Sequence, residues 1–339
     1  MKIVVSKDGK GDFTTIGEAL EAIGKSQDAA VTNDNRADTT VRIFIEEGIY
    51  KEKLLISTPF LILEGISPEK TIICYDDYAK KQDSTGEPLG TFGTSVLMVD
   101  AHNITIKNLT IQNTAGAGGL VGQAIALYLE GDYIEINNCR ILASQDTVFT
   151  GPLPPFPLQP GGFKGPKEKS PRIHGRHYFK NCYIEGDVDF IFGSSTAYFE
   201  SCELFSRNNR DREITENMIY GYVTAPSTTR ESLYGYVFSC CRFTGDCPPE
   251  SVYLGRPWRN FGRVVLINCD LGEHIKTEGW SDWGKIDARN TVYFAEYGSK
   301  GKGASGFIRG KRAAWSKILQ KDDLHLYTKD QVLCGFYKQ

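Results

Sequence analysis

A short motif recurs along the chain and constrains its fold more than any other feature. Six segments between residues 104 and 271 mostly share the pattern apolar, any residue, Asn or Ser, Cys or Leu, any residue, apolar. The Cys or Leu positions are Leu109, Cys139, Cys182, Cys202, Cys241 and Cys269, at intervals of 30, 43, 20, 39 and 28 residues. An interval of 20 is typical of one coil of a solenoid, and longer intervals indicate extra coils or loops. The repeat predicts a parallel β-solenoid, with a β-sandwich carrying coincidental Asn-Cys pairs as the alternative.

The rest of the chain fits an all-β domain with a few short helices. Apolar alternation bounded by Gly, Asn, Asp and Ser runs from residue 41 almost to the end. Thr15 and Glu18 form a capping-box pattern ahead of an apolar helix face, which predicts a helix covering one end of the core. We expect a second helix over Ala313–Leu319 and a third after Thr328, both at the other end. We treat residues 1–339 as one domain.

The interval of 43 residues contains an insertion. Residues 151–172 hold seven of the 14 prolines and cannot continue a central strand. Removing these 22 residues leaves 21, about one coil, so Cys139 and Cys182 are predicted to stack on adjacent rungs. We expect the Pro- and Gly-rich segment to be a surface loop whose removal hardly changes stability.

Two aspartates follow this register. Asp146 lies seven residues after Cys139, and Asp189 lies seven residues after Cys182. Stacked cysteines would therefore place the carboxylates on adjacent rungs, roughly 5 Å apart by the spacing of strands. Two carboxylates this close favour one protonated and one ionised group, an arrangement typical of an acid and a nucleophile. Alternatively, both aspartates only occupy turns at the ends of rungs.

The composition of the chain excludes some classes of binding partner. The 39 Lys and Arg residues against 42 Asp and Glu give a net charge of -3, without a basic surface for nucleic acid or an anionic membrane. No apolar stretch is long enough to span a membrane. The nine cysteines are interpreted as buried thiols, and neither disulfides nor a zinc site is expected. If Met1 is the native start, we expect an intracellular protein, because charge follows at once; a secreted protein with a trimmed signal peptide is the alternative.

Four segments resemble the signature segments of the pectin methylesterases, in the order of that family. They are Gly122–Leu127, Ser144–Phe149, Val188–Gly193 and Leu254–Trp258. The resemblance extends over residues 3–335 and implies a right-handed parallel β-helix. It also implies hydrolysis of the methyl esters of galacturonate units in pectin or its oligomers, without metal or organic cofactor. Separately, we expect the protein to be a monomer.

The resemblance assigns roles residue by residue. It makes Asp189 the nucleophile and Asp146 the acid that protonates departing methanol, with Gln145 and Gln123 as oxyanion donors. Substrate-binding residues would be Arg256, Trp258, Thr91 and Gln123. Asp187 departs from the small uncharged residue that is usual in the family, and its negative charge is expected to raise pKa values in the site.

Two other functions fit parts of the pattern. Paired carboxylates about 5 Å apart also suit a β-helical glycosidase or lyase acting on polygalacturonate. A solenoid could also bind polysaccharide without catalysis. The glutamines favour the esterase, because acyl transfer develops an oxyanion that amide groups can stabilise.

Overall fold

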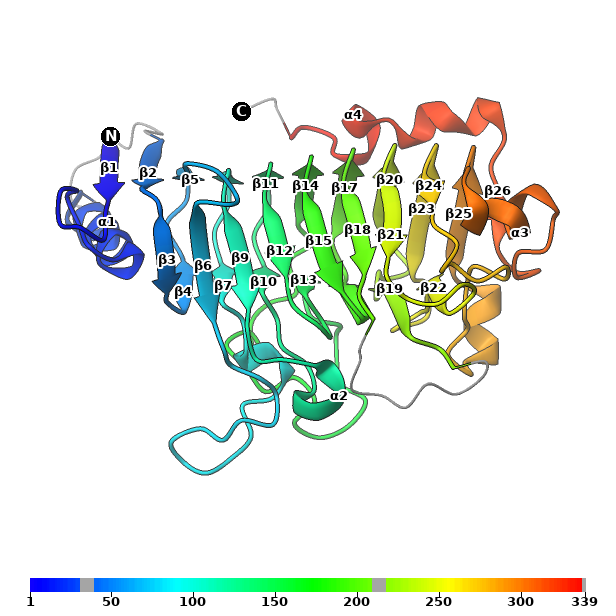
Figure 1. The fold of residues 1–339 in the computed structure, drawn as a ribbon, viewed down its shortest axis with the longest axis horizontal. Coiled ribbons are helices and arrows are strands. Elements are labelled where there is room, and N and C mark those ends of the chain that lie inside the picture. The colour runs from blue at the N-terminus through cyan, green and yellow to red at the C-terminus, as the bar shows by residue number, and fades with distance from the viewer. Residues whose placement is uncertain (31–39, 209–217, 337–339) are drawn as a thin grey trace.

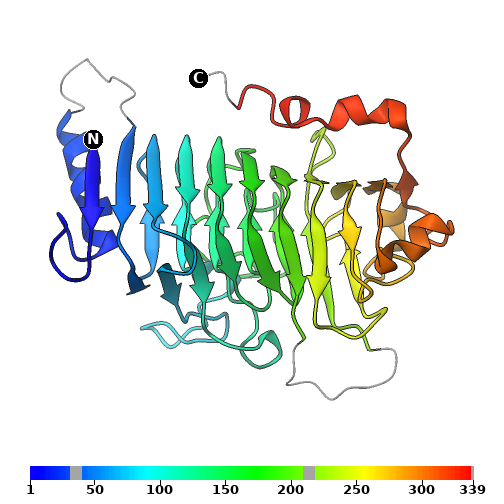
Figure 2. The same ribbon diagram turned by 45° about the horizontal axis from the view of Figure 1, so that its top comes forward.

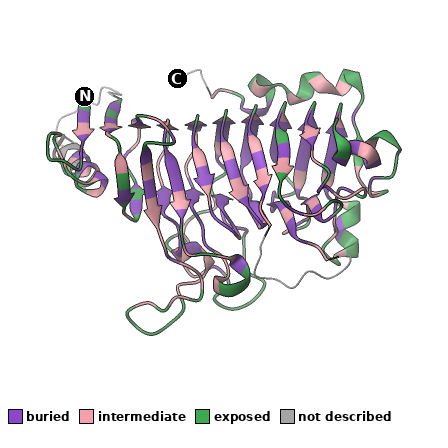
Figure 3. Cartoon of the chain, viewed as in Figure 1, coloured by how far each residue is buried: buried purple, intermediate pink, exposed green. Residues whose placement is uncertain are grey.

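The chain winds into a β-helix with three parallel sheets (Figure 1). The computed structural model describes residues 1–30, 40–208 and 218–336. In each full turn the chain passes from the eleven-stranded sheet to the eight-stranded sheet and then to the seven-stranded sheet. Buried residues follow the strands, whereas exposed ones gather on the loops and short helices (Figure 3). The predicted parallel solenoid is confirmed.

Strands that are neighbours in a sheet come from successive turns. The eleven-stranded sheet contains β1 (Lys2–Val5), β2 (Val41–Ile45), β5 (Leu61–Gly65), β8 (Ile104–Lys107), β11 (Ile134–Asn137), β14 (Arg176–Lys180), β17 (Thr196–Glu200), β20 (Tyr236–Ser239), β23 (Arg263–Ile267), β25 (Tyr293–Tyr297) and β26 (Lys317–Ile318). The eight-stranded sheet contains β3 (Gly48–Lys51), β6 (Thr71–Tyr75), β9 (Thr110–Asn113), β12 (Arg140–Leu142), β15 (Tyr183–Gly186), β18 (Glu203–Ser206), β21 (Arg242–Gly245) and β24 (Asp270–Leu271). The seven-stranded sheet contains β4 (Leu54–Ile56), β7 (Leu97–Val99), β10 (Leu127–Leu129), β13 (Val148–Thr150), β16 (Val188–Gly193), β19 (Gly221–Pro226) and β22 (Val252–Gly255).

The sequence repeat marks the bend between the first two sheets. The residue before each Cys or Leu marker has a left-handed backbone, with φ between 50° and 57° at Asn108, Asn138, Asn181, Ser201, Cys240 and Asn268. Asn adopts this conformation more readily than most residues, which explains its recurrence at the bend. The markers precede strands that are direct neighbours from β9 to β24. Every interval between markers is therefore one rung, and the long intervals hold loops rather than extra coils.

The marker cysteines form a buried ladder. Cys139, Cys182, Cys202, Cys241 and Cys269 are buried free thiols, and each thiol lies 3.4–3.6 Å from a backbone carbonyl oxygen of the preceding rung. The interpretation as buried thiols is confirmed for these residues and for Cys247, whereas Cys74 is partly buried and Cys240 and Cys334 are exposed.

Short helices lie outside the sheets. They are α1 (Ile16–Ala30), η1 (Thr91–Gly93), α2 (Gly118–Val121), η2 (Ile286–Asn290), η3 (Lys302–Ala304), α3 (Ser305–Ile308), η4 (Lys321–Tyr327) and α4 (Lys329–Val332). The predicted α1 is confirmed together with its capping box. The Thr15 N–H donates a hydrogen bond to Glu18 Oε2 at 3.2 Å, and the Glu18 N–H donates one to Thr15 Oγ1 at 3.2 Å. Within the described ranges, no helix is both long and apolar enough to cross a membrane.

The C-terminal segment differs from the expectation. The helix predicted over Ala313–Leu319 is wrong, because Lys317 and Ile318 form β26 and pair with β25. The helix after Thr328 is confirmed as α4, but it lies along the eleven-stranded sheet rather than at its end (Figure 2). Val332 and Leu333 are buried against Tyr178 and Tyr198 of that sheet. Burial of this apolar outer face determines where the segment lies.

Candidate active site

Asp146 and Asp189 lie on adjacent rungs of the seven-stranded sheet. The pairing of Val148 with Ile191 places the aspartates opposite each other, and the Asp146 N–H donates to the Val188 carbonyl at 3.1 Å. Val148 and Ile191 belong to the interior core, and strict alternation would point the aspartates inward as well. Both aspartates instead have a left-handed backbone, with φ of 66° and 51°. This conformation interrupts the alternation, so the carboxylates need not point into the core. The predicted stacking of the two aspartates on adjacent rungs is confirmed.

Arg256 binds the Asp189 carboxylate through two hydrogen bonds. Its Nε donates to Oδ1 at 2.8 Å and its Nη2 donates to Oδ2 at 2.7 Å. The guanidinium carbon lies 3.8 Å from the ring centroid of Tyr222 and 3.7 Å from that of Trp283. A cation held between two aromatic faces keeps its charge and its orientation. Arg256 therefore fixes the position and the charge of the carboxylate that is predicted to be the nucleophile.

The two carboxyl groups lie in different electrostatic environments. Burial raises the pKa of Asp146 well above its usual range, and the negative charge of Asp189 raises this pKa further. Burial also raises the pKa of Asp189, but the hydrogen bonds and charge of Arg256 oppose that rise. These environments favour a protonated Asp146 beside an ionised Asp189, and the roles of the two groups stay a prediction.

Asp187 acts on the same pair. It is buried, and its Oδ1 accepts a hydrogen bond from the Val188 N–H at 2.6 Å. Its charge adds to the effects that raise the pKa of Asp146. The direction of this effect is the one expected from this departure from the family pattern.

Gln145 and Gln123 lie on neighbouring rungs beside the aspartates. The Ala124 N–H, next to Gln123, donates to the Gln145 carbonyl at 3.1 Å. The Gln145 side chain interacts with Asp146 by a hydrogen bond that lowers the pKa of Asp146. Gly118 of α2 packs on Gln145 so closely that an added Cβ would lie 2.7 Å from the Gln145 Cβ. This close approach restricts the space into which the amide can turn.

Trp258 lies in an aromatic cluster on the outer face of the seven-stranded sheet. Its ring is stacked over Phe92 with centroids 6.4 Å apart, and it meets Phe163 and Phe192 at 6.2 Å and 5.8 Å. Trp258 remains partly exposed, so one face can contact a ligand. Thr91 directly precedes Phe92 at the start of η1, and its role in substrate binding stays a prediction.

The insertion at residues 151–172 is anchored to this cluster. Phe163 is buried between Phe92 and Trp258. Lys164 donates to the Pro88 carbonyl at 2.6 Å and pairs with Asp83 at 3.1 Å. The expectation that trimming the loop leaves stability nearly unchanged is therefore revised, because it would remove buried Phe163 from between Phe92 and Trp258, and losing a buried aromatic side chain costs about 3 kcal/mol or more.

A buried acid lies under the base of the insertion. Gly151 packs directly on Glu130, since an added Cβ would lie 2.4 Å from Glu130 Oε2. Burial raises the pKa of Glu130 from its ordinary value of 4.5 to about 7. Lys167 and Arg172 of the insertion oppose this rise in pKa, whereas Asp100 adds to it.

Replacing Glu130 by Gln should remove one pH dependence of stability. The folded chain binds this proton more tightly than the unfolded chain does, so the free energy of unfolding is highest below pH 4.5 and falls as the pH rises through 7. The loss is roughly 3 kcal/mol, and Glu130→Gln should avoid it. Urea unfolding at pH 5 and pH 8 measures the effect. An equal loss of stability in both proteins between these pH values would contradict the assignment.

Lys285 was missed by sequence reasoning. Its Nζ donates to the carbonyls of Pro257 and Trp258 at 2.8 Å and 3.0 Å, and lies 4.1 Å from the Trp283 ring centroid. Burial, together with the positive charges of Arg259 and Arg256, lowers its pKa to about 8. A single lysine in a loop carries no recognisable sequence signal. Only the fold brings it close to Asp189, where its charge opposes the rise in pKa that burial causes.

These features define a class of protein. In the part of the chain that the structure describes, no group of three or more His, Cys, Asp or Glu side chains is placed to hold a metal ion. The reactive groups present are a carboxylate fixed by Arg256, a neighbouring buried acid and two amide side chains. A carboxylate, a neighbouring acid and amide donors are the groups that a hydrolase attacking through an aspartate would need.

Comparison with known proteins identifies the family. The sequence profile described as Pectinesterase matches residues 2–153 and 172–335. The chain therefore belongs to the pectinesterase family, and it is a carboxylic ester hydrolase that removes methyl esters from pectin. The expected fold class, a right-handed parallel β-helix, is confirmed as well.

The relatives cover nearly the whole chain. Pectinesterase 31 of Arabidopsis thaliana is 32% identical over 327 residues, which are 94% of this chain and 88% of that protein. Pectin methylesterase PemA of Erwinia chrysanthemi has a TM-score of 0.74 at 28% identity, over 98% of this chain and 96% of the other. A pectin methylesterase mutant in complex with a hexasaccharide has a TM-score of 0.75 at 27% identity, over the same shares.

Proposed function

We propose that this pectinesterase hydrolyses methyl-esterified galacturonate units with Asp189 as nucleophile and Asp146 as acid and base. The observation that carries the proposal is the pair itself, in which Arg256 holds Asp189 through two hydrogen bonds while burial and charge raise the pKa of Asp146. A carboxylate must be ionised to attack, and a leaving methoxide needs a proton donor. The environment of Asp189 favours the ionised carboxylate, and that of Asp146 favours the protonated acid.

The reaction has two halves. Asp189 attacks the ester carbonyl, and the carbon–oxygen bond to methanol breaks as Asp146 transfers its proton to the departing oxygen. This leaves an anhydride between the substrate and Asp189. Asp146, now ionised, then takes a proton from a water molecule that attacks the substrate carbonyl, and Asp189 leaves as a carboxylate. Each turnover consumes one water molecule and gives methanol and a free galacturonate.

Gln145 and Gln123 are proposed to stabilise the oxyanion of each tetrahedral intermediate. Amide N–H groups do not titrate, so they remain donors at every pH at which the enzyme works. Gln145 lies on the Asp146 rung and Gln123 on the neighbouring rung, and this adjacency supports the proposal that both act on one oxyanion. Arg256 and Trp258 are proposed to border the bound sugar, with the Trp258 ring packing on its apolar face.

Replacing Gln145 by Ala should lower kcat by about 10²-fold to 10³-fold, the effect of losing one oxyanion donor. Gln123→Ala should do the same, because both donors act on the charge that develops in the transition state. Initial rates of methanol release over a range of pectin concentrations measure the effect. A change confined to KM would instead make the altered glutamine a substrate-binding residue.

One assay tests the proposed reaction against its rivals. Purified protein is incubated with highly methylated pectin, and methanol, new reducing ends and unsaturated sugars are measured. Methanol alone is expected, since the site is built for acyl transfer. New reducing ends would indicate a glycosidase, unsaturated products a lyase, and no product a binding protein, and each of these outcomes would overturn the proposal.

A further inference from the structure

Gln123, one of the two proposed oxyanion donors, lies between regular elements. It belongs to residues 122–126, which connect the end of α2 to the start of β10. This connection is hydrogen-bonded on both sides. The Gln123 carbonyl accepts from the Ala79 N–H at 2.9 Å, and the Ala124 N–H donates to the Gln145 carbonyl at 3.1 Å. Contacts with neighbouring loops therefore fix the backbone from which the Gln123 amide extends.

Two side chains hold the backbone of Ile125. Thr94 Oγ1 accepts from the Ile125 N–H at 3.0 Å, and Asn113 Nδ2 donates to the Ile125 carbonyl at 3.1 Å. Thr94 is fully buried, and Asn113 is 6% exposed. Hydrogen bonds in such an environment are electrostatically stronger than in water. They fix the chain two residues after Gln123.

The amide of Asn113 links this backbone to other segments. Its Nδ2 also donates to the Asp77 carbonyl at 2.9 Å and to the Thr94 carbonyl at 3.3 Å. Its Oδ1 accepts from the Ala115 N–H at 3.0 Å. A flipped amide would direct its oxygen at carbonyl oxygens, so the orientation of this side chain is defined. Asn113 therefore joins several stretches of the chain beside Gln123.

The loop that binds the Gln123 carbonyl is anchored by the same residue. Asp77 lies two residues before Ala79, which donates this hydrogen bond. Asp77 is buried, and its carboxylate pairs with Lys53 at 2.6 Å. Because Asn113 binds the Asp77 carbonyl, both this loop and the connection that carries Gln123 depend on one side chain.

We propose that Asn113, supported by Thr94, is a positioning residue that holds the Gln123 amide where the oxyanion develops. This proposal rests on the proposed role of Gln123. Asn113 is buried, so it acts through the backbone rather than by contact with the substrate. A donor stabilises an oxyanion best when its position is fixed before the charge forms, and a displacement of about 1 Å can lower the rate about 10²-fold.

A double-mutant cycle tests this role. Asn113→Ala should lower kcat for methanol release about tenfold to 10²-fold and change KM by less than about twofold, because the substrate contacts remain. Gln123→Ala removes the side chain that Asn113 positions. Adding Asn113→Ala to Gln123→Ala should therefore lower kcat by less than about twofold further. Losses that multiply in the double variant would overturn the positioning role, because a general defect would act in both backgrounds.

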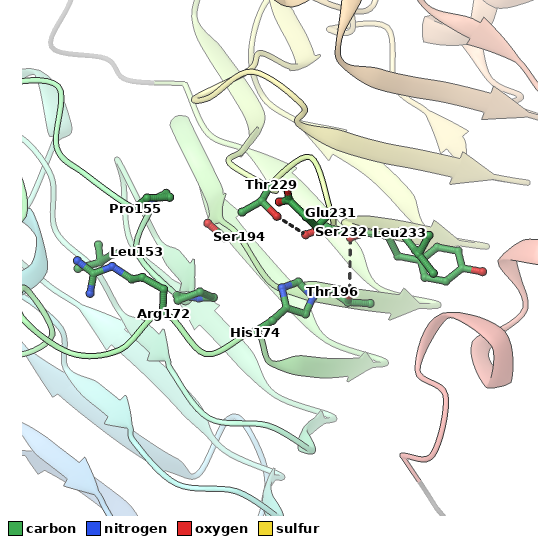
Figure 4. A pocket seen from close by; sticks show the side chains of 12 residues that line it. Leu153, Pro155, Arg172, His174, Ser194, Thr196, Thr229, Glu231, Ser232 and Leu233 are labelled. Atoms are coloured by element: carbon green, nitrogen blue, oxygen red, sulfur yellow. Dashed lines mark hydrogen bonds between the residues drawn. The ribbon is translucent and has the colours of Figure 1, made fainter.

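Substitutions at Thr94 give a milder test with a matched control. Thr94→Val removes the hydroxyl with little change of shape and should lower kcat about tenfold, whereas Thr94→Ser keeps the hydroxyl and should retain most of the activity. Thr196 is also buried, at the cavity shown in Figure 4, and its Oγ1 forms a hydrogen bond with His174 at 2.8 Å. Gln123 precedes a strand of the seven-stranded sheet and Thr196 follows one, so Thr196→Val should leave kcat unchanged. Equal losses in the two valine variants would contradict the proposal.

A crystal structure tests the positioning role independently of the reaction. In Asn113→Ala the Gln123 amide should move by about 1 Å or more, or occupy several rotamers. An unmoved amide would overturn the proposal even if wild-type protein released no methanol, a result that would overturn the proposed function instead. Melting temperatures show whether each variant folds, and Thr94→Val takes the place of Asn113→Ala in the cycle and in the crystal structure if the latter does not fold.

Discussion

Replacing Asp189 by Asn is expected to lower methanol release by several orders of magnitude, on the order of 10⁴-fold, the scale seen when a covalent nucleophile is lost. Asn has nearly the same shape as Asp, but its neutral amide cannot form the anhydride. Initial rates on highly methylated pectin measure the loss. Retention of more than a tenth of the activity would remove the nucleophile assignment.

A matched variant separates the effect of the substitution on catalysis from its effect on stability. Asp189→Asn leaves Arg256 without its ionic partner, and this alone destabilises the fold. Asp132 forms a comparable pair with Arg176 in the eleven-stranded sheet, with hydrogen bonds from Nε and Nη2. Asp132→Asn should therefore lower the melting temperature to a similar degree and retain activity. A comparable loss of activity in both variants would mean that the ion pair acts through folding.

The register of the catalytic pair could be predicted because its signals are local. An Asn at four of the six bends and a buried Cys after five of them make the repeat visible, and both preferences act within a few residues. Once Cys139 and Cys182 are aligned, Asp146 and Asp189 follow by equal spacing. The spacing did not reveal the left-handed backbone at both aspartates. This backbone interrupts the alternation of inward and outward side chains that a regular strand has.

Contacts between distant loops were not predictable in this way. Phe163 is buried against Phe92 and Trp258, which lie 71 and 95 residues away in the sequence. Lys285 reaches the site through backbone carbonyls, which have no sequence signature. The failed helix over Ala313–Leu319 has the same origin, because pairing with β25 outweighs a weak local preference.

Replacing Asp146 by Asn should reduce methanol release by about 10²-fold to 10⁴-fold, the range associated with a positioned acid or base. The loss should depend on the leaving group, since methoxide needs a proton from Asp146 whereas an aryl oxide does not. With a nitrophenyl ester of galacturonate, Asp146→Asn should release a burst of nitrophenol and then stall. The burst reports attack by Asp189, and the stall reports the missing base for the water molecule.

The pH profile gives an independent check on Asp146. Attack on the methyl ester requires ionised Asp189 and protonated Asp146, so kcat/KM should fall at low pH as Asp189 gains a proton and at high pH as Asp146 loses one. The charge of Asp187 raises the pKa of Asp146, so Asp187→Asn should move the alkaline limb to lower pH. The nitrophenyl burst should lack this alkaline limb in wild-type protein, because its leaving group needs no acid. If the methyl ester and the nitrophenyl ester show the same alkaline limb, Asp146 does not act as the acid that protonates methanol.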